Sequence, residues 1–306
     1  NKSLGTIVAI SSYASYFWQP IMNLGNIFNN FINNIAYLER IFETIDEPVT
    51  VKDAEHAIEM PKIRGKVTFD HVTFAYDETK TILKDVSFTV NPGESVALVG
   101  PTGAGKSTIV NLISRFYNVN DGKVLIDDQD IANVTIHSLR AQMGIMMQDS
   151  FIFSGTIADN IRYGKLDATQ EEIEKAGKIV CADPFIREMP KGYETQVRER
   201  GSMLSQGQKQ LISFARTLLC DPAILILDEA TSSIDVQTEK ALQTGLNRML
   251  KGRTSFIIAH RLSTIRGCDK IMYIDDGGIA EAGTHEELMK KKGRYYKLYT
   301  AQKSLH

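Results

Sequence analysis

The stretch that decides the fold reads Ser95-Val-Ala-Leu-Val-Gly-Pro-Thr-Gly-Ala-Gly-Lys-Ser-Thr108 and continues as Ile109-Val-Asn-Leu-Ile113. Its apolar beginning predicts a short buried strand, and its end predicts a helix that opens near Lys106. Glycines between the two elements let backbone N–H groups converge on a phosphate without Cβ clashes, and the helix N-terminus adds its dipole to the same anion. The stretch therefore predicts a nucleotide site built on a phosphate-binding loop.

Residues of this loop take separate roles at such a site. Lys106 is expected to reach the β- and γ-phosphates, and the Ser107 hydroxyl is expected to ligate Mg²⁺. The rest of the predicted nucleotide-binding loop is Gly100, Thr102, Gly103, Ala104, Gly105 and Thr108. An Asn-Lys-x-Asp element that reads guanine is absent from the sequence, so ATP with Mg²⁺ is the expected pair of cofactors.

The second half of the site is predicted at the end of another apolar strand, Ala223-Ile-Leu-Ile-Leu227. Asp228 follows it and would hold Mg²⁺ through water, while Glu229 would polarise the attacking water. Taken alone, an apolar strand that ends in Asp-Glu is common at strand boundaries. Combined with the glycine loop, it favours hydrolysis over simple binding.

Three more side chains follow predicted strands. Tyr76 is suited to stack on adenine, with ordinary strand packing as the alternative. The Gln148 amide is placed to touch the Mg²⁺ shell and the attacking water, and His260 to donate a hydrogen bond to the γ-phosphate. Ligands of open α/β sheets gather at the carboxyl ends of strands, which favours the functional interpretation.

The remaining pattern predicts an α/β fold. Strands with period-2 alternation come first, at 66–76 and 86–90, and apolar strands interleaved with helices follow. Such continuous apolar strands indicate a parallel sheet covered on both faces. The later strands are predicted at 123–126, 143–147, 223–227, 255–259 and 270–274. A helical insertion without such a strand is predicted at about 150–219.

The N-terminal region has a different character. No Asp, Glu, Lys or Arg occurs from Ser3 to Leu38, and the apolar first part is shorter than the roughly 20 residues of a full membrane span. Beyond Pro20, asparagines recur at helical spacing on one face, and charge returns before Glu47-Pro48 ends the helix. A helix cut off at its start explains this pattern, and a helix packed on a soluble domain is the alternative. Residues 48–61 are the predicted linker, and the chain is expected to be a fragment of a longer protein.

Composition excludes some classes of protein. A formal net charge of -2, from 35 basic and 37 acidic residues, argues against a nucleic-acid partner. The three cysteines form no CxxC pair, so neither a disulfide framework nor a zinc site is indicated, and a reduced, cytosolic setting is expected for most of the chain.

One further motif makes a family resemblance specific. Leu204-Ser-Gln-Gly-Gln208 resembles the signature motif of the ABC ATPase family, and the order of all the motifs along 62–298 is similar to that family's order. The resemblance implies a P-loop NTPase with a RecA-like core, an antiparallel β-subdomain and an inserted α-helical subdomain. It makes Tyr76 the adenine-stacking aromatic, Gln148 the Q-loop residue, Asp235 the D-loop acid and His260 the switch histidine.

The same resemblance implies a partner. In this family the signature closes over ATP bound to a second subunit, so Ser205, Gly207 and Gln208 would bind nucleotide in trans. ATP-driven dimerisation of the two ATPase domains would then power transport.

Other stretches point to the exporter branch. Gln19-Pro-Ile-Met-Asn23 with Leu38-Glu-Arg-Ile-Phe-Glu-Thr-Ile-Asp46 is similar to the last membrane helix of ABC exporters, and Thr195-Gln-Val-Arg-Glu-Arg-Gly201 resembles their short loop that touches membrane helices. Residues 1–47 would then be the end of the last membrane helix with its cytoplasmic extension, and 62–306 the ATPase domain. The resemblance implies a multi-pass subunit of the cell membrane with a cytoplasmic ATPase domain.

Two positions depart from the family's pattern. Gln206 replaces the first of two signature glycines, and Arg198 stands where the exporter loop has glycine. A longer side chain near the phosphates would impair the site to which this chain lends its signature. A heterodimer whose partner lacks the catalytic glutamate is therefore favoured, and a homodimer that tolerates Gln206 is the alternative.

Two other functions compete with export. A soluble ABC ATPase acting on DNA or ribosomes would need a coiled coil, a basic surface or paired cassettes, which the sequence lacks. A regulatory domain that binds nucleotide without hydrolysing it is disfavoured by the presence of Glu229 and His260 together.

Overall fold

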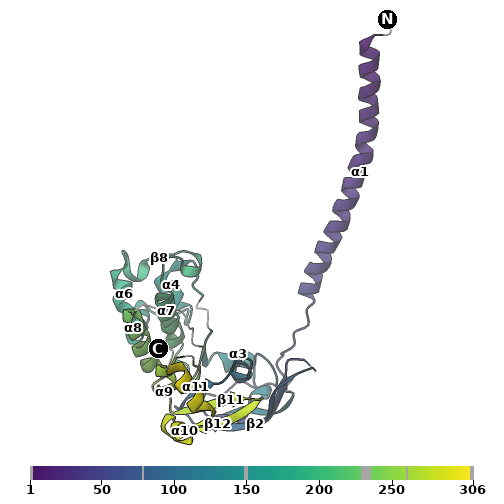
Figure 1. Ribbon diagram of the computed structural model, residues 1–306. Helices are drawn as coiled ribbons and strands as arrows, with labels where there is room; N and C mark the ends of the chain where they lie inside the picture. Colours follow the sequence, from purple (N-terminus) through teal and green to yellow (C-terminus); the bar gives the residue numbers. More distant parts are fainter. Residues whose placement is uncertain (1–2, 78, 148–150, 229–235, 260, 304–306) are drawn as a thin grey trace. The chain divides into compact units, whose positions relative to one another are not determined.

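The computed structural model describes residues 3–77, 79–147, 151–228, 236–259 and 261–303 (Figure 1). It divides into two compact units, residues 1–50 and 51–306. The division after Thr50 falls inside the predicted linker. Each unit is described by itself below.

The first unit is a single helix. Helix α1 (Leu4–Ile45) runs through Pro20, ends with the Asp46 N–H donating to the Phe42 carbonyl at 2.8 Å, and has no buried residue. The predicted helix over the charge-free stretch is confirmed. Among the described residues, no helix combines the length and apolarity needed to cross a membrane.

A six-stranded sheet forms the centre of the second unit. Its parallel strands lie in the order β11, β3, β10, β9 and β6, and β12 joins the β11 edge in antiparallel orientation. The bounds are β3 (Ser95–Val99), β6 (Met143–Met146), β9 (Ile224–Asp228), β10 (Thr254–Ile258), β11 (Lys270–Asp275) and β12 (Gly278–Gly283). The predicted parallel sheet is confirmed, and the antiparallel edge strand β12 is an addition that the sequence pattern did not predict.

Alternate residues of the central strands belong to different cores. On β10, Phe256 and Ile258 are buried in one hydrophobic cluster, while Ile257 between them is buried in the other. Successive side chains of a strand point to opposite faces, so a strand such as β10, which is buried at every position, must be covered on both.

One face is covered by a helix layer and a second sheet. The layer contains α2 (Lys106–Ile113) and α3 (Ile136–Arg140). The sheet is antiparallel, in the order β2, β1, β4 and β5, with β1 (Val67–Ala75), β2 (Thr81–Val90), β4 (Asp121–Ile126) and β5 (Gln129–Asp130). The short helix η1 (Ile131–Asn133) follows β5.

One strand assignment from the sequence was wrong. Residues 123–126 were predicted with the parallel strands, whereas β4 pairs antiparallel to β1, with Ile126 opposite Val67. The reason lies in burial, because β4 buries only alternate residues while β3 is buried at every position. A short strand with half its residues buried suits an antiparallel sheet with one solvated face.

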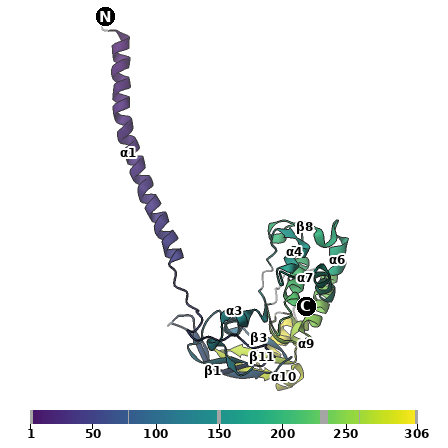
Figure 2. The ribbon, with the colours of Figure 1, turned by 180° about the vertical axis from the view of Figure 1, so that it is seen from behind.

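The other face is covered by the helical lobe that the sequence predicted, visible as α4, α6 and α7 in Figures 1 and 2. The helices within the predicted range are α4 (Ile157–Arg162), α5 (Gln170–Ile179), α6 (Asp183–Glu188) and α7 (Gln206–Leu219). Short elements lie between them, namely β7 (Gly155–Thr156), η2 (Gly192–Glu194), β8 (Gln196–Val197) and η3 (Glu199–Gly201). Helix α8 (Val236–Leu250) lies beyond that range and packs against α7. Helices α9 (Leu262–Gly267), α10 (His285–Lys291) and α11 (Arg294–Lys303) complete the chain.

Capping residues decide where several of these helices begin. Thr156, Thr169, Ser205 and Thr284 each accept a hydrogen bond from the backbone N–H three residues later, and the residue there returns one. This reciprocal pair satisfies two N–H groups that a helix start leaves free.

The lobe approaches the sheet closely at Gly144 on β6. A Cβ there would lie 2.6 Å from the Thr217 methyl of α7 and 2.8 Å from a Leu225 methyl. Only a residue without a side chain lets α7 pack at this distance.

Replacing Gly144 with alanine should therefore destabilise the fold by about 1–3 kcal/mol, the usual cost of overpacking a core. Denaturant unfolding measures the change. Gly267→Ala is the matched control, since a Cβ at Gly267 meets nothing within 4 Å. Equal stability of the two variants would contradict the close-packing argument.

Candidate nucleotide site

The glycine loop connects β3 to α2 and depends on two backbone conformations. Gly100 has a φ of 142°, and a Cβ there would lie 2.1 Å from the Ile274 carbonyl oxygen. Gly105 caps α2 with a φ of 103°, in the left-handed region that side chains disfavour. The loop turns its backbone toward the α2 N-terminus through these two residues.

Lys106, the first residue of α2, folds back over the loop. Its Nζ donates to the Gly100 carbonyl at 2.9 Å and to the Pro101 carbonyl at 2.8 Å. Burial lowers the pKa of the Lys106 ammonium, and the Asp228 carboxylate acts in the opposite direction. The ammonium is thus held at the loop by two carbonyl oxygens, which phosphate oxygens can replace as hydrogen-bond acceptors.

Asp228 ends β9 at the same edge of the sheet. Strands β3 and β9 both pair with β10, where Ile258 lies beside Leu98 on one side and Asp228 on the other. The parallel register therefore brings the carboxylate next to the loop, as the effect of Asp228 on Lys106 also indicates. The Ser107 hydroxyl and the Asp228 carboxylate carry the hard oxygen atoms that Mg²⁺ prefers, and their roles, with Asp228 acting through water, stay predictions.

Tyr76 follows β1 and lies against α2. Its hydroxyl is 3.2 Å from Thr108 Oγ1, and its ring makes edge contacts with Phe74 and Tyr117, each at 4.9 Å between centroids. Tyr76 remains 48% exposed. About half of the residue's surface is therefore packed in the protein and half is accessible, so strand packing is observed and stacking on adenine stays a prediction.

Tyr117 belongs to this aromatic cluster, although the sequence analysis missed it. It is 42% exposed and contacts both Phe74 and Tyr76. The only signal was the aromatic pair Phe116-Tyr117 directly after the predicted helix.

The signature residues form the N-terminus of α7. Ser205 Oγ accepts from the Gln208 N–H at 3.2 Å, and Gln208 Oε1 accepts from the Ser205 N–H at 2.9 Å. Gly207 is buried in the first turn, and Gln206 is its half-buried first residue. The departure at Gln206 therefore leaves the helix start intact.

Other predicted site residues are not placed. Gln148, Glu229, Asp235 and His260 lie outside the described residues, so their roles as Mg²⁺ ligand, catalytic base, D-loop acid and γ-phosphate donor stay predictions.

Comparison with known proteins agrees with this geometry. The family model described as "ABC transporter" matches residues 83–232. An uncharacterized ABC transporter ATP-binding protein of Bacillus subtilis, YfiC, is 50% identical over 98% of this chain and 50% of its own length. A fatty acid ABC transporter ATP-binding/permease protein of Mycobacterium bovis is 44% identical over 98% of this chain and 47% of its own.

A solved structure is similar to this chain in fold. The chain superposes with a TM-score of 0.80 on a bacterial Atm1-family ABC exporter with ATP bound, at 41% identity, covering 98% of this chain and 52% of that one. The chain thus spans about half the length of the curated relatives that it matches.

Ser205 has a structural role as the cap of α7, and this role can be tested through stability without any ligand. Ser205→Ala should cost about 0.5–2 kcal/mol of stability through loss of the cap, and Ser205→Asp should preserve stability because aspartate caps equally well. Thermal unfolding of the two variants checks this. Loss of stability in the aspartate variant would show that Ser205 does more than cap α7.

Proposed function

Since the chain carries an ABC ATPase domain of the exporter type, we propose that it is the ATP-hydrolysing half of an exporter subunit. One observation carries the proposal. Lys106 and Asp228, from elements far apart in sequence, meet at one sheet edge beside a loop with phosphate-binding geometry.

In the proposed reaction, water attacks the γ-phosphorus of ATP and ADP leaves with its β-oxygen. Lys106 exchanges the Gly100 and Pro101 carbonyls for β- and γ-phosphate oxygens, and the N-terminus of α2 stabilises the same charge. Glu229 takes the proton of the attacking water, and Gln148 and His260 orient the water and the γ-phosphate. Ser107, and Asp228 through water, would hold Mg²⁺, which would supply neutralisation of the phosphate charge.

A second subunit completes the proposed site. The α7 N-terminus of one chain, with Ser205, Gly207 and Gln208, would close on the γ-phosphate bound by the other chain. The positive end of a 14-residue helix suits an anion, which supports this arrangement. Because each ATP lies between two chains, binding would join the ATPase domains and hydrolysis would release them.

Export requires a link to the membrane. We place residues 1–47 at the end of the last membrane helix and its cytoplasmic extension, in a multi-pass subunit whose ATPase domain, 62–306, faces the cytoplasm. The uninterrupted α1, with large apolar side chains exposed along its length, supports this placement. The Gln148 and Arg198 loops would pass domain movements to the membrane helices.

The partner is proposed to be a different subunit. Gln206 brings a longer side chain to the helix start that would approach the partner's ATP, so the site built with this signature would be the weaker of two. The site built on this chain's own loop keeps Lys106, Asp228 and Glu229. That asymmetry favours a heterodimer over a homodimer.

Lys106→Ala should weaken Mg-ATP binding about 10- to 100-fold, because it removes charge-assisted hydrogen bonds to the phosphates. Titration calorimetry measures the affinity. Lys175→Ala, at an exposed lysine of α5, is the matched control and should bind as the unaltered chain does. Undiminished binding by the Lys106 variant would refute the assigned phosphate site.

Glu229→Gln should lower ATP turnover about 10²- to 10⁴-fold while ATP binding and ATP-dependent dimerisation survive, because only the general base is lost. Phosphate release and light scattering, measured on the chain with its partner, check both parts. Glu171→Gln, at an exposed glutamate of α5, is the control. Residual turnover at the control's rate would reject the role of Glu229.

A further inference from the structure

Arg115 is a buried arginine just beyond the C-terminal end of α2. Only 2% of its surface is exposed, and its backbone has a φ of 52°. The same helix begins at Lys106, so α2 connects the nucleotide loop to this arginine. A buried charge is costly unless it is paired, so the partners of Arg115 indicate what it does.

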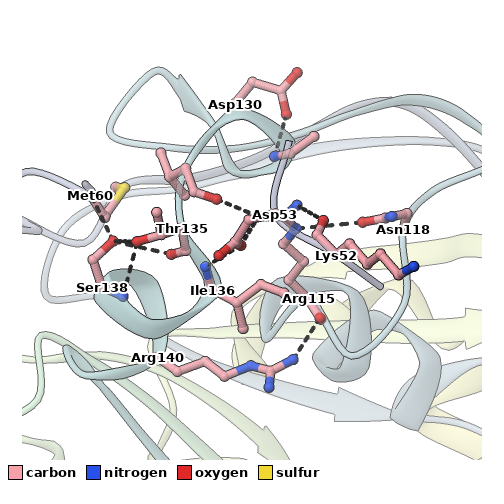
Figure 3. Close-up of polar contacts among 12 residues, drawn as sticks. Lys52, Asp53, Met60, Arg115, Asn118, Asp130, Thr135, Ile136, Ser138 and Arg140 are labelled. Carbon is pink, nitrogen blue, oxygen red and sulfur yellow. Dashed lines mark hydrogen bonds and ion pairs between the residues drawn. The ribbon is translucent and has the colours of Figure 1, made fainter. Parts of the chain in front are cut away.

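These partners come from three different segments (Figure 3). Nη2 donates to the Lys52 carbonyl at 3.0 Å, and Nη1 lies 3.7 Å from the Asp53 carboxylate. Nη1 also donates to the Val134 carbonyl, and Nε donates to Asn118 Oδ1 at 3.5 Å. The guanidinium thus joins the end of α2 to the segment through which the chain enters the second unit.

Asp53 has a second partner on the same face. Its Oδ1 accepts a hydrogen bond from the Ile136 N–H, the first residue of α3, at 2.8 Å. A carboxylate near a helix start is favourable for that helix. One side chain of the entering segment is therefore bound both to Arg115 and to α3.

The other end of the entering segment is also fixed. The Met60 N–H donates to Ser138 Oγ at 2.7 Å. Gln142 accepts from the Ile63 N–H at 2.8 Å and donates to the Pro61 carbonyl at 3.1 Å. We call Val51–Ile63 the strap, because polar contacts hold it at both ends.

Apolar packing continues these contacts into the core. Met60 and Ile63 are only 6% and 5% exposed and belong to the same buried cluster as Leu112 and Ile113 of α2. Between the two ends, Ile58 pairs with Val134 in a parallel bridge. The strap is therefore bound to Arg115, just beyond the end of α2, and shares a hydrophobic core with α2 itself.

We infer that the strap transmits movement between the polypeptide that precedes it and the P-loop helix, with Arg115 as its positioning residue. The strap follows α1 in the chain, separated from it by Asp46–Thr50 alone. Nucleotide binding acts on the N-terminal end of α2, and Arg115 ties its C-terminal end to the strap. The inference rests on the proposed function, because the nucleotide at the loop is the event that the strap senses.

Arg140 offers a matched control at the same helix end. Its Nε donates to the Ser114 carbonyl at 3.0 Å and its Nη2 to the Arg115 carbonyl at 2.7 Å, and its guanidinium lies 4.5 Å from the Phe116 ring centre. Among the described residues, its hydrogen bonds go to the end of α2 and not to the strap. Arg140 therefore supports the end of α2 directly, and it acts on the strap only through the charge of the Asp53 carboxylate.

The test is hydrogen exchange of the whole chain, with and without a non-hydrolysable ATP analogue and Mg²⁺. In the unaltered chain the analogue should slow exchange in the loop peptide, 100–113, and in the strap peptide, 51–63. In Arg115→Met the strap should exchange about tenfold faster or more and lose its response to the analogue, while the loop keeps its response. In Arg140→Met the strap should keep its response.

A second variant guards against misfolding of Arg115→Met. Asp53→Ala removes a 44%-exposed strap carboxylate and leaves Arg115 in place, so it should change strap exchange in the same direction by a smaller factor. A strap that ignores the analogue while the loop responds would overturn the inference. The inference would also be overturned if hydrogen exchange of the strap in both variants equalled that in the unaltered chain. If exchange in the loop peptide does not respond to the analogue, the result contradicts the proposed nucleotide site. The hold of Arg115 on the strap is then still tested by comparing strap exchange in the variants and in the unaltered chain without the analogue, which distinguishes the two failures.

Discussion

Everything in the second unit follows from a parallel sheet that has to be covered on both faces. Strands β3 and β10 are buried at every position, so neither face can meet water. The apolar side chains of these strands are buried in two separate clusters. One cluster includes residues of α2 and the antiparallel sheet, and the other includes residues of the helical lobe. Removing either layer would expose one complete face of the sheet.

The same constraint produces the site. Parallel strands end at one edge of the sheet, and ligands of open α/β sheets bind outside the carboxyl ends of the strands. Gly100 follows β3 at that edge, and Asp228 ends β9 one strand away across β10. The order of strands therefore brings a cation, a carboxylate and a helix N-terminus to one edge of the sheet, although Lys106 and Asp228 are more than a hundred positions apart in sequence.

The layers divide the proposed work between them. The layer with α2 holds nucleotide, and the lobe presents the α7 N-terminus for a partner's nucleotide. Close packing of α7 on Gly144 of β6 joins that lobe to the sheet. The strap adds a second connection, just beyond the C-terminal end of α2, where the buried Arg115 binds the entering chain. Contacts at the two ends of α2 would give the proposed route from the nucleotide to the segment that precedes the strap.

The sequence alone determined the chemistry of the loop, because Gly100, Gly105 and Lys106 are required by local backbone geometry and charge. It also determined the parallel sheet, the helical lobe and α1, since apolar periodicity and capping residues are local signals. Tertiary structure decided the features that depend on partners distant in sequence. These are the antiparallel placement of β4, the edge strand β12, the addition of Tyr117 to the aromatic cluster, and the clamp of Arg115 on Lys52 and Asp53. In the sequence, Arg115 is an ordinary charged residue after a helix, and only its burial among oxygen atoms of Lys52, Asn118 and Val134 gives it a role.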